Sequence, residues 1–297
     1  PTRRSSDLIA LGTTALDAIT TGDNNTAIGY NALTTNTTGD NNTAIGYRAL
    51  EDATGSKSVA IGHDAAKEHT SSDPIVAIGS GSADANTSGY ANTAVGTNSL
   101  SDCTTGYRNV AVGEASLGGT TLSNNTGVGY AALQSLTSGG ANTGMGTSAG
   151  DSITDATYNA FFGYGSGGGT TGGSNVFLGG NAGGASASAN SANVVIGLDA
   201  GYQLGASGGA AQHNTLIGYH AGLLHNGNCA TNTCLGSASG DEITTGSNNT
   251  LIGYRAGTAD SPSGSITTGD NIVCFGDTGV TAAYVEIDAW TTSDERD

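Results

Sequence analysis

Residues 25–50 read NTAIGYNALTTNTTGDNNTAIGYRAL, so that the segment beginning at Asn25 returns almost unchanged 17 residues later. Its core is a four-residue signature: usually Thr or Val, then a variable residue, a large apolar residue and glycine. The signature occurs sixteen times in 297 residues, with the first eleven steps spaced by 16–18 residues and two later steps of 21 and 23. A short period over a whole chain predicts stacked identical units. The closing glycines are Gly12, Gly29, Gly46, Gly62, Gly79, Gly96, Gly113, Gly129, Gly146, Gly163, Gly179, Gly197, Gly218, Gly236, Gly253 and Gly276.

Each unit has the composition of one coil of β-structure. A short β-branched stretch, a glycine and a second apolar stretch are followed by a turn rich in Thr, Asn and Gly. Such a unit is too short for two helices, and its composition disfavours even one. We predict two short strands per unit, stacked about 4.8 Å from those of the next unit. The expected fold is all-β: a parallel β-solenoid (β-roll) of about sixteen 17-residue coils, a rod of roughly 75–80 Å.

An asparagine precedes the signature in twelve of the sixteen copies. Asparagine tolerates the left-handed conformation, and its side chain can bond the backbone of a neighbouring coil. Identical residues stacked in register can therefore form a hydrogen-bonded ladder. We predict a structural ladder of Asn25, Asn42, Asn92, Asn109, Asn125, Asn142, Asn159, Asn175, Asn193, Asn214, Asn232 and Asn249.

Two classes of coil are visible in the apolar positions. Two residues before the glycine, the first nine copies have Ala or Gly, and the last seven have larger residues, from Phe161 to Cys274. Four residues after the glycine, the Leu of most early copies gives way to Gly from Gly150 onward. A core of constant volume requires such an exchange, so we predict that both positions face one packed layer. Residues 9–150 then form Ala/Leu-type coils, and residues 151–280 form bulky/Gly-type coils.

The two ends depart from the repeat. Residues 1–8 (PTRRSSDL) resemble the translation of a common sequencing-adapter end, and we interpret them as a non-native leader. Residues 281–297 contain an alternating apolar stretch and the only tryptophan, Trp290, and we expect a C-terminal cap or the start of a missing domain there.

The charge balance narrows the choice of partners. The chain has 25 acidic and 8 basic residues, a net charge of −17, and the acidic residues are scattered. Phosphate binding needs clustered Lys and Arg, so we expect no nucleic-acid partner. No apolar run reaches the roughly 20 residues of a membrane span, so we expect no membrane insertion by this segment.

Motifs that carry chemistry in other proteins are weak here. His213, His220, His225 and Cys229 lie within 17 residues, but adjacent coils offer no aligned ligands for zinc. The Gly-Asp-Asn turns of calcium-binding rolls recur in too few copies. Residues 163–167 contain Gly-x-Ser-x-Gly without the strand–turn–helix context of a nucleophile elbow. We therefore predict no enzyme, no catalytic residue, no cofactor and no metal site.

The four cysteines do not suggest a disulfide framework. Cys234 and Cys274 both occupy the core position two before the glycine. Two coils, about 10 Å, separate them, which is too far for a disulfide. The sequence leaves open whether a disulfide joins Cys229 and Cys234 within one coil.

The signature resembles that of a known family. Lys57–Gly62 (KSVAIG) is similar to the Asn-Ser-Val-Ala-Ile-Gly repeat of trimeric autotransporter adhesin heads, the YadA-like left-handed β-roll. The longer unit, NTAIGYxALxxNTTG, is similar to repeats of bacterial surface proteins and phage tail fibres. The resemblance implies a homotrimer outside the cell, on a cell surface or a virion, that attaches through a host-surface glycan or protein receptor.

We therefore predict a structural and adhesive rod, with loops 202–212 and 259–265 as candidate receptor contacts. The alternative is an ice- or crystal-surface-binding solenoid, because Thr-rich turns could align into a hydroxyl array. The Thr pairs lapse between Thr171 and Thr244, which weakens that alternative. A carbohydrate-active β-solenoid enzyme is more remote, since paired carboxylates would have to recur at matched positions in adjacent coils.

Overall fold

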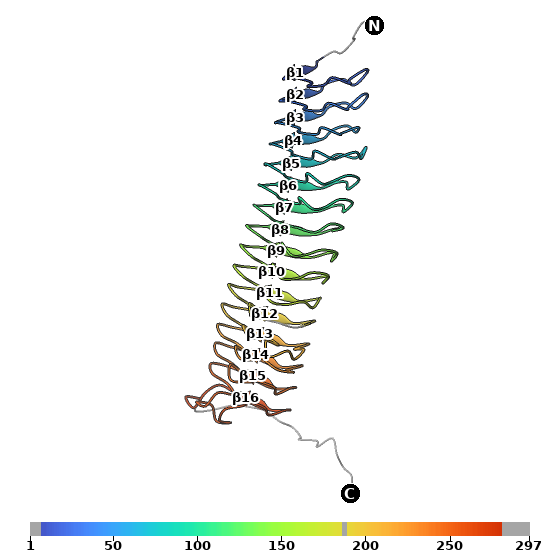
Figure 1. Ribbon diagram of the computed structural model, residues 1–297. Helices are drawn as coiled ribbons and strands as arrows, with labels where there is room; N and C mark the ends of the chain where they lie inside the picture. Colours follow the sequence, from blue (N-terminus) through green and yellow to red (C-terminus); the bar gives the residue numbers. More distant parts are fainter. Residues whose placement is uncertain (1–6, 186–188, 281–297) are drawn as a thin grey trace, which may run out of the picture.

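The computed structural model describes residues 7–185 and 189–280, which form a long rod of stacked coils (Figure 1). It contains sixteen strands of three residues each and, within the described ranges, no helix. All strands belong to one sheet, in which each pairs in parallel with the next along the chain. The predicted all-β parallel solenoid is confirmed. The predictions for residues 1–6 and 281–297 lie outside the described residues.

The strands follow the signature without exception. They are β1 (Ile9–Leu11), β2 (Thr26–Ile28), β3 (Thr43–Ile45), β4 (Val59–Ile61), β5 (Val76–Ile78), β6 (Thr93–Val95), β7 (Val110–Val112), β8 (Thr126–Val128), β9 (Thr143–Met145), β10 (Ala160–Phe162), β11 (Val176–Leu178), β12 (Val194–Ile196), β13 (Thr215–Ile217), β14 (Thr233–Leu235), β15 (Thr250–Ile252) and β16 (Val273–Phe275).

Each coil has one strand rather than the two that we predicted. After the signature glycine the chain turns left-handed twice, as at Asn31 (φ 54°) and Leu33 (φ 53°) in the coil of β2. Left-handed residues at alternate positions are incompatible with an extended strand. Backbone hydrogen bonds still join the coils here, since Leu33 N donates to Ala49 O at 3.0 Å. The second apolar stretch is therefore a stacked turn.

The signature glycine is the point of closest approach between coils. At Gly29, where φ is 134°, a Cβ would lie 2.3 Å from the carbonyl oxygen of Gly46. Both the dihedral angle and the contact exclude an L side chain. From Gly12 to Gly236, every signature glycine has a φ between 127° and 143°. The invariant residue of the repeat is thus required by the stacking itself.

Two of the core positions share one layer of the interior. The middle residue of each strand from β2 to β16 is buried, and the fourth residue after the glycine lies beside it, as Leu50 does in the coil of β3. A Cβ at Gly167 would lie 2.6 Å from the ring of Phe161, and one at Gly183 would lie 2.5 Å from the ring of Phe177. Glycine at one position therefore makes room for the ring at the other, so the two positions share one packed layer.

The coil of β9 joins the two classes, because it has glycine at both positions. A Cβ at Gly144 would lie 2.8 Å from Cγ of Leu133, in the preceding coil. A Cβ at Gly150 would lie 2.5 Å from the ring of Phe161, in the following coil. Leu133 and Phe161 thus fill this layer from the two sides.

Moving this junction by one coil tests the shared layer. Gly144→Phe alone places a ring against Leu133, and we expect overpacking to cost about 1–3 kcal/mol. Leu133→Gly alone leaves a cavity and should cost about 2–5 kcal/mol. In the double variant the new ring can pack on Phe161 as Phe161 packs on Phe177, with ring centroids 5.5 Å apart.

We expect the double variant to be more stable than the sum of the single effects by about 0.5–3 kcal/mol. Urea unfolding of the four proteins measures these free energies. Strictly additive effects would mean that the two positions do not touch.

Candidate functional site

The twelve asparagines form a buried hydrogen-bonded column along the rod. Each is at most 2% exposed. The Oδ1 atom of each accepts a hydrogen bond from the backbone N–H of the equivalent residue in the next coil, as Asn125 does from Asn142 at 2.9 Å. The Nδ2 atom donates to a backbone carbonyl of that coil, as Asn125 does to Gly139 at 2.9 Å. The column satisfies polar backbone groups that burial would otherwise leave unpaired.

The left-handed conformation belongs to the residue before each ladder asparagine, such as Asn41 (φ 61°) before Asn42. The ladder asparagine does not use the left-handed conformation that it tolerates, and its role lies in its side-chain amide. Ser58 and Ile75 interrupt the ladder. The hydroxyl of Ser58 accepts from Ile75 N at 3.3 Å, but an isoleucine side chain offers no acceptor to the next coil, where the ladder resumes at Asn92.

Replacing a central ladder residue tests its contribution to stability. Asn142→Ala removes the acceptor for the N–H of Asn159 and the donor to the carbonyl of Ala156. An orphaned buried group costs about 1–3 kcal/mol, so we expect a lower urea midpoint and faster amide exchange at Asn159. Asn142→Ser is the matched control, because Ser58 performs the acceptor role with a hydroxyl, and it should lose less. Equal losses, or none with alanine, would contradict this role.

The outer face of the sheet carries an apolar strip that the sequence analysis did not identify. Since the middle residue of each strand faces the interior, its two neighbours face outward. The parallel register aligns the third residues of all strands, as Ile28 with Ile45. We call these residues the outer strip: Leu11, Ile28, Ile45, Ile61, Ile78, Val95, Val112, Val128, Met145, Phe162, Leu178, Ile196, Ile217, Leu235, Ile252 and Phe275.

The outer strip is accessible and uncharged. Met145 is 41% exposed, Leu178 46% and Leu235 44%, and nine of the sixteen strip residues, such as Ile28 and Val95, are half-buried. The first residues of the strands, which flank the strip, are Thr, Val, Ile or Ala in every coil. Large contiguous apolar patches on soluble proteins are commonly interaction sites, and the outer strip is the candidate for such a site here. The sequence did contain a signal for this strip, namely the apolar third residue of each strand. That residue can be assigned to the outer face only when the strand is known to be three residues long.

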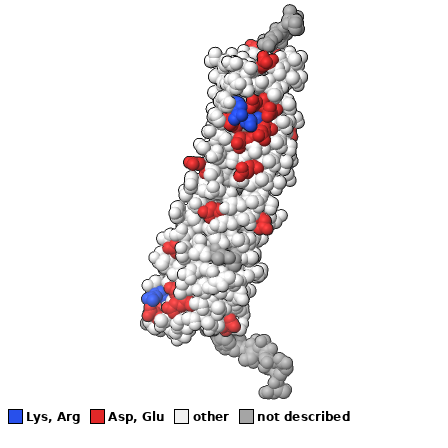
Figure 2. All heavy atoms as spheres, in the orientation of Figure 1, with Lys and Arg blue, Asp and Glu red and all other residues white. Residues whose placement is uncertain are grey.

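Charged side chains lie on other parts of the surface. Arg48 pairs with Asp64 at 2.7 Å, and near the other end of the rod Arg255 pairs with Asp260. The space-filling view shows two places where basic side chains sit among acidic ones, with mostly uncharged surface between them (Figure 2). No residue of the outer strip is charged, so these clusters leave it uninterrupted.

Threonines of the turns also align between coils. The hydroxyl of Thr70 donates to the carbonyl of Thr87 at 3.0 Å, and Thr87 donates likewise to Thr104 at 3.1 Å. Thr104 continues the series to Thr120 at 3.1 Å. Because these hydroxyl protons bond the backbone of the next coil, they are not presented to solvent. The arrangement does not favour the ice-binding alternative.

All four cysteines are buried free thiols, so no bridge joins Cys229 and Cys234. Burial raises the pKa of Cys229 to about 11 and that of Cys234 to about 12. Thiols that stay protonated at neutral pH are poor nucleophiles and poor metal ligands. Within the described ranges, no three His, Cys, Asp or Glu side chains are placed to share a metal ion.

His225 is fully buried, and neither ring nitrogen has a hydrogen-bond partner. Burial in this apolar layer lowers the pKa of its imidazole from 6.5 to about 4. The equivalent position holds Leu204 in the preceding coil and Ile243 in the following one. The site is therefore built for an apolar side chain, and it holds histidine in the neutral form.

This burial makes the stability of the rod sensitive to acid. In the unfolded chain His225 titrates near its ordinary pKa, so the unfolded state takes up the proton first as the pH falls. The contribution to stability is complete above about pH 6.5 and is lost toward pH 4, an effect of about 3 kcal/mol. We expect His225→Leu to unfold at a higher urea concentration than wild type at pH 4.5.

Urea melts followed by circular dichroism at pH 7 and pH 4.5 measure this difference. His213→Asn, at an exposed left-handed position, is the control and should keep the acid sensitivity of wild type. A parallel pH dependence in wild type and His225→Leu would disprove the assignment to His225.

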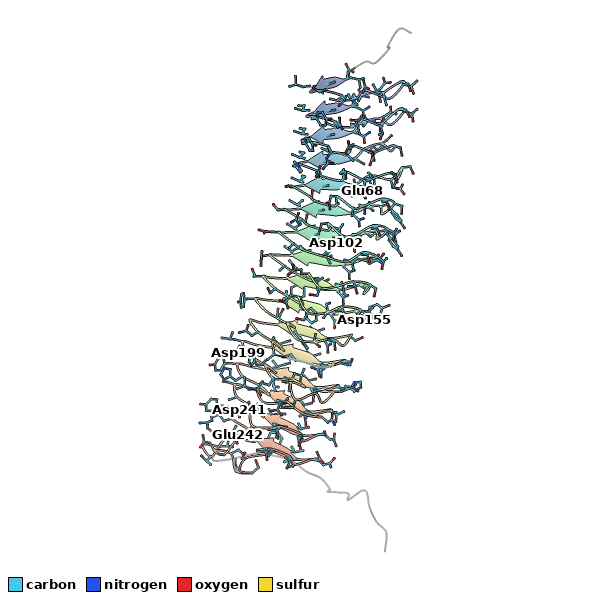
Figure 3. All side chains as sticks on the ribbon, in the orientation of Figure 1. Glu68, Asp102, Asp155, Asp199, Asp241 and Glu242 are labelled. Carbon is cyan, nitrogen blue, oxygen red and sulfur yellow. The ribbon has the colours of Figure 1, made fainter. Side chains whose placement is uncertain are left out.

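Acidic side chains are spread along the rod. Glu68, Asp102, Asp155 and Asp199 come from different coils along the rod (Figure 3). Ser166, at the centre of the Gly-x-Ser-x-Gly match, is fully buried in a turn between two coils. A nucleophile must be accessible to its substrate, and this hydroxyl is not.

The two loops expected to contact a receptor pack along the stack. Within residues 202–212, Gly205 N donates to His225 O and Ser207 N donates to Asn226 O, both at 2.7 Å. Within residues 259–265, Asp260 O accepts a hydrogen bond from Thr278 N at 2.7 Å, and the hydroxyl of Ser261 donates to Thr258 O at 2.9 Å.

No protein-family model matches the chain, and no curated protein or solved structure shows a significant match. Across the described residues, no helix is long and apolar enough to cross a membrane. The structure by itself defines a repeat protein of the β-solenoid class.

Proposed function

We propose that the protein is a structural and adhesive rod, part of a bacterial surface adhesin or a phage tail fibre, that works as a homotrimer outside the cell. The observation that carries the proposal is the outer strip, which runs along a solenoid whose successive coils are joined by hydrogen bonds. The similarity of Lys57–Gly62 to the repeat of trimeric adhesin heads supports the three-fold assembly and the location.

The occupant that fits the outer strip is a second copy of this chain. The strip repeats at the strand spacing of about 4.8 Å, and interdigitation over many coils needs a partner with the same period. A homo-oligomer supplies partners with the same period, and three copies of the strip can meet around a threefold axis. The absence of charge from the strip also lets copies with a net charge of −17 approach along this face.

Attachment uses the faces that the assembly leaves outside. They carry turns and side chains that vary from coil to coil, while the strands and the ladder hardly vary. A rigid scaffold with variable outer positions is the arrangement on which binding sites are commonly built. The receptor is a glycan or a protein of the surface to which the rod attaches.

Charge introduced into the strip should separate the copies without unfolding them. Met145→Glu combined with Leu178→Glu places two carboxylates on the strip, and burying them at an interface would be unfavourable. We expect light scattering to give a trimer mass for wild type and a monomer mass for this variant, with unchanged circular dichroism. Thr121→Glu combined with Ser138→Glu adds the same charge at exposed turns and should remain trimeric.

Wild type that stays monomeric at concentrations of tens of micromolar would disprove the homotrimer. Adhesion is tested separately with fluorescent beads coated with wild type or with the monomeric variant, washed over mucin-coated glass and over bacterial cells. We expect beads carrying wild-type protein to be retained on at least one surface. Retention no better than that of albumin-coated beads on both would count against adhesion.

A further inference from the structure

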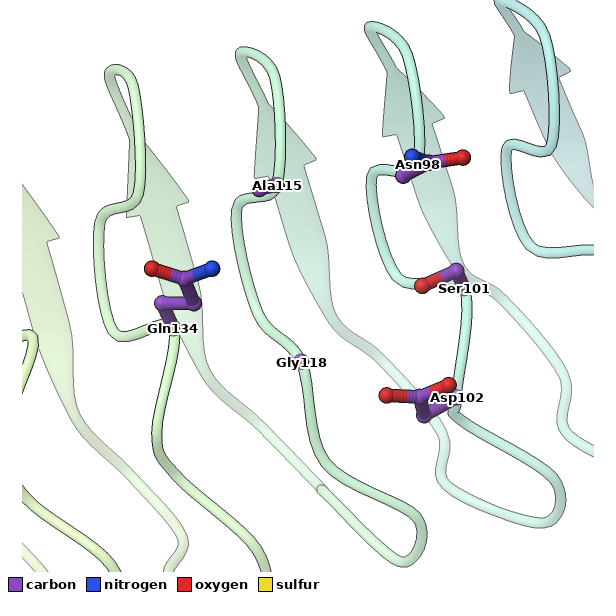
Figure 4. Close-up of a pocket in the computed structure, with 6 residues that line it drawn as sticks. All are labelled: Asn98, Ser101, Asp102, Ala115, Gly118 and Gln134. Carbon is purple, nitrogen blue, oxygen red and sulfur yellow. The ribbon is translucent and has the colours of Figure 1, made fainter.

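A pocket of about 310 Å³ interrupts one side of the rod at the coil of β7. Its floor is formed by the small residues Ala115 and Gly118. The preceding coil supplies one wall and the following coil supplies the other (Figure 4). The lining residues are Asn98, Ser101, Asp102, Ala115, Gly118 and Gln134.

The polar groups of the walls are available to a ligand. Asn98, Asp102 and Gln134 are exposed, and within the described ranges their side chains have no hydrogen-bond partner. Asn98 and Gln134 belong to coils two apart, a separation of about 10 Å, so their amides face the notch from opposite sides.

The chemistry of the lining selects a class of ligand. Asn98 turns its Nδ2 donor toward the notch, because its Oδ1 lies toward Gly81 of the preceding coil. Gln134 and the Ser101 hydroxyl each offer donors and acceptors, and Asp102 adds acceptors. Neighbouring hydroxyl groups need this mixture, since each can donate and accept. An apolar ligand would find only the methyl group of Ala115 to contact. A divalent cation needs several oxygen ligands with more charge than one carboxylate. An anion would be repelled by Asp102 and by the nearby Asp84.

We propose that this pocket binds one unit of a neutral saccharide. The inference rests on the proposed adhesive function, for which a surface glycan is one of the two receptor classes. It places the glycan contact on the side of the rod in the coils of β6 to β8.

Ala115→Asn is the variant that tests the pocket. Ala115 is left-handed (φ 55°), and the same column holds asparagine in that conformation at Asn31, Asn98 and Asn181. The substitution therefore suits the fold and fills the notch. Ala238→Asn makes the same change in the same column seven coils further along, away from the pocket, and is the control.

Saturation-transfer difference NMR with millimolar D-galactose, D-mannose and N-acetyl-D-glucosamine, each alone, measures binding. We expect wild type and Ala238→Asn to transfer saturation to at least one sugar, and Ala115→Asn to lose that signal. Asp102→Asn keeps the shape and the acceptor oxygen, so it should retain binding of a neutral sugar.

No transfer to any sugar in wild type would overturn the proposal, and so would an undiminished signal in Ala115→Asn. Loss of binding in Asp102→Asn would overturn the neutral class, because it would show that charge is recognised. Light scattering on the same samples reports the trimer independently. The saccharide proposal can thus be disproved while the rod still assembles and adheres, so its failure is distinguishable from failure of the proposed function.

Discussion

The contact between backbones at the signature glycine governs the whole rod. At Gly29 the space for a Cβ is already taken by the carbonyl of Gly46, so the coils stack as closely as the backbone allows. Such contact in coil after coil keeps equivalent residues in vertical columns, whatever the length of the turns between them. The buried amide column and the outer strip both follow, because each needs one residue type at a constant height in every coil.

The stacking also explains a core made of small residues and amides. The interior of each coil has little volume, so small residues and amides fill much of it beside a few large side chains, such as Leu133 and Leu136 in the coil of β8. Apolar burial per coil is modest, and the backbone and amide hydrogen bonds to the next coil provide much of the specificity. A coil of this kind is stable only between neighbours, which is the behaviour of quasi-one-dimensional repeat proteins.

Sequence alone was sufficient for the architecture, because period, composition and the signature are local properties of every copy. It failed on the second strand, because Leu33 and Leu50 are left-handed and leucine is not a residue type that signals this conformation in a sequence. It missed the outer strip because the apolar residue at that position looks like core until the strand is known to be three residues long. The pocket and the orphaned imidazole of His225 depend on what stands above and below them, and such column neighbours are defined only once the turn lengths are aligned.

The coil with glycine at both core positions has a consequence for how such rods grow. It acts as an adaptor between the two classes, because its glycines at the two exchanged positions make room for Leu133 on one side and for Phe161 on the other. Duplication or deletion of whole units on either side would leave the packing around this coil unchanged. The length of the protein can therefore drift by unequal recombination of the repeated DNA while both kinds of interior stay packed.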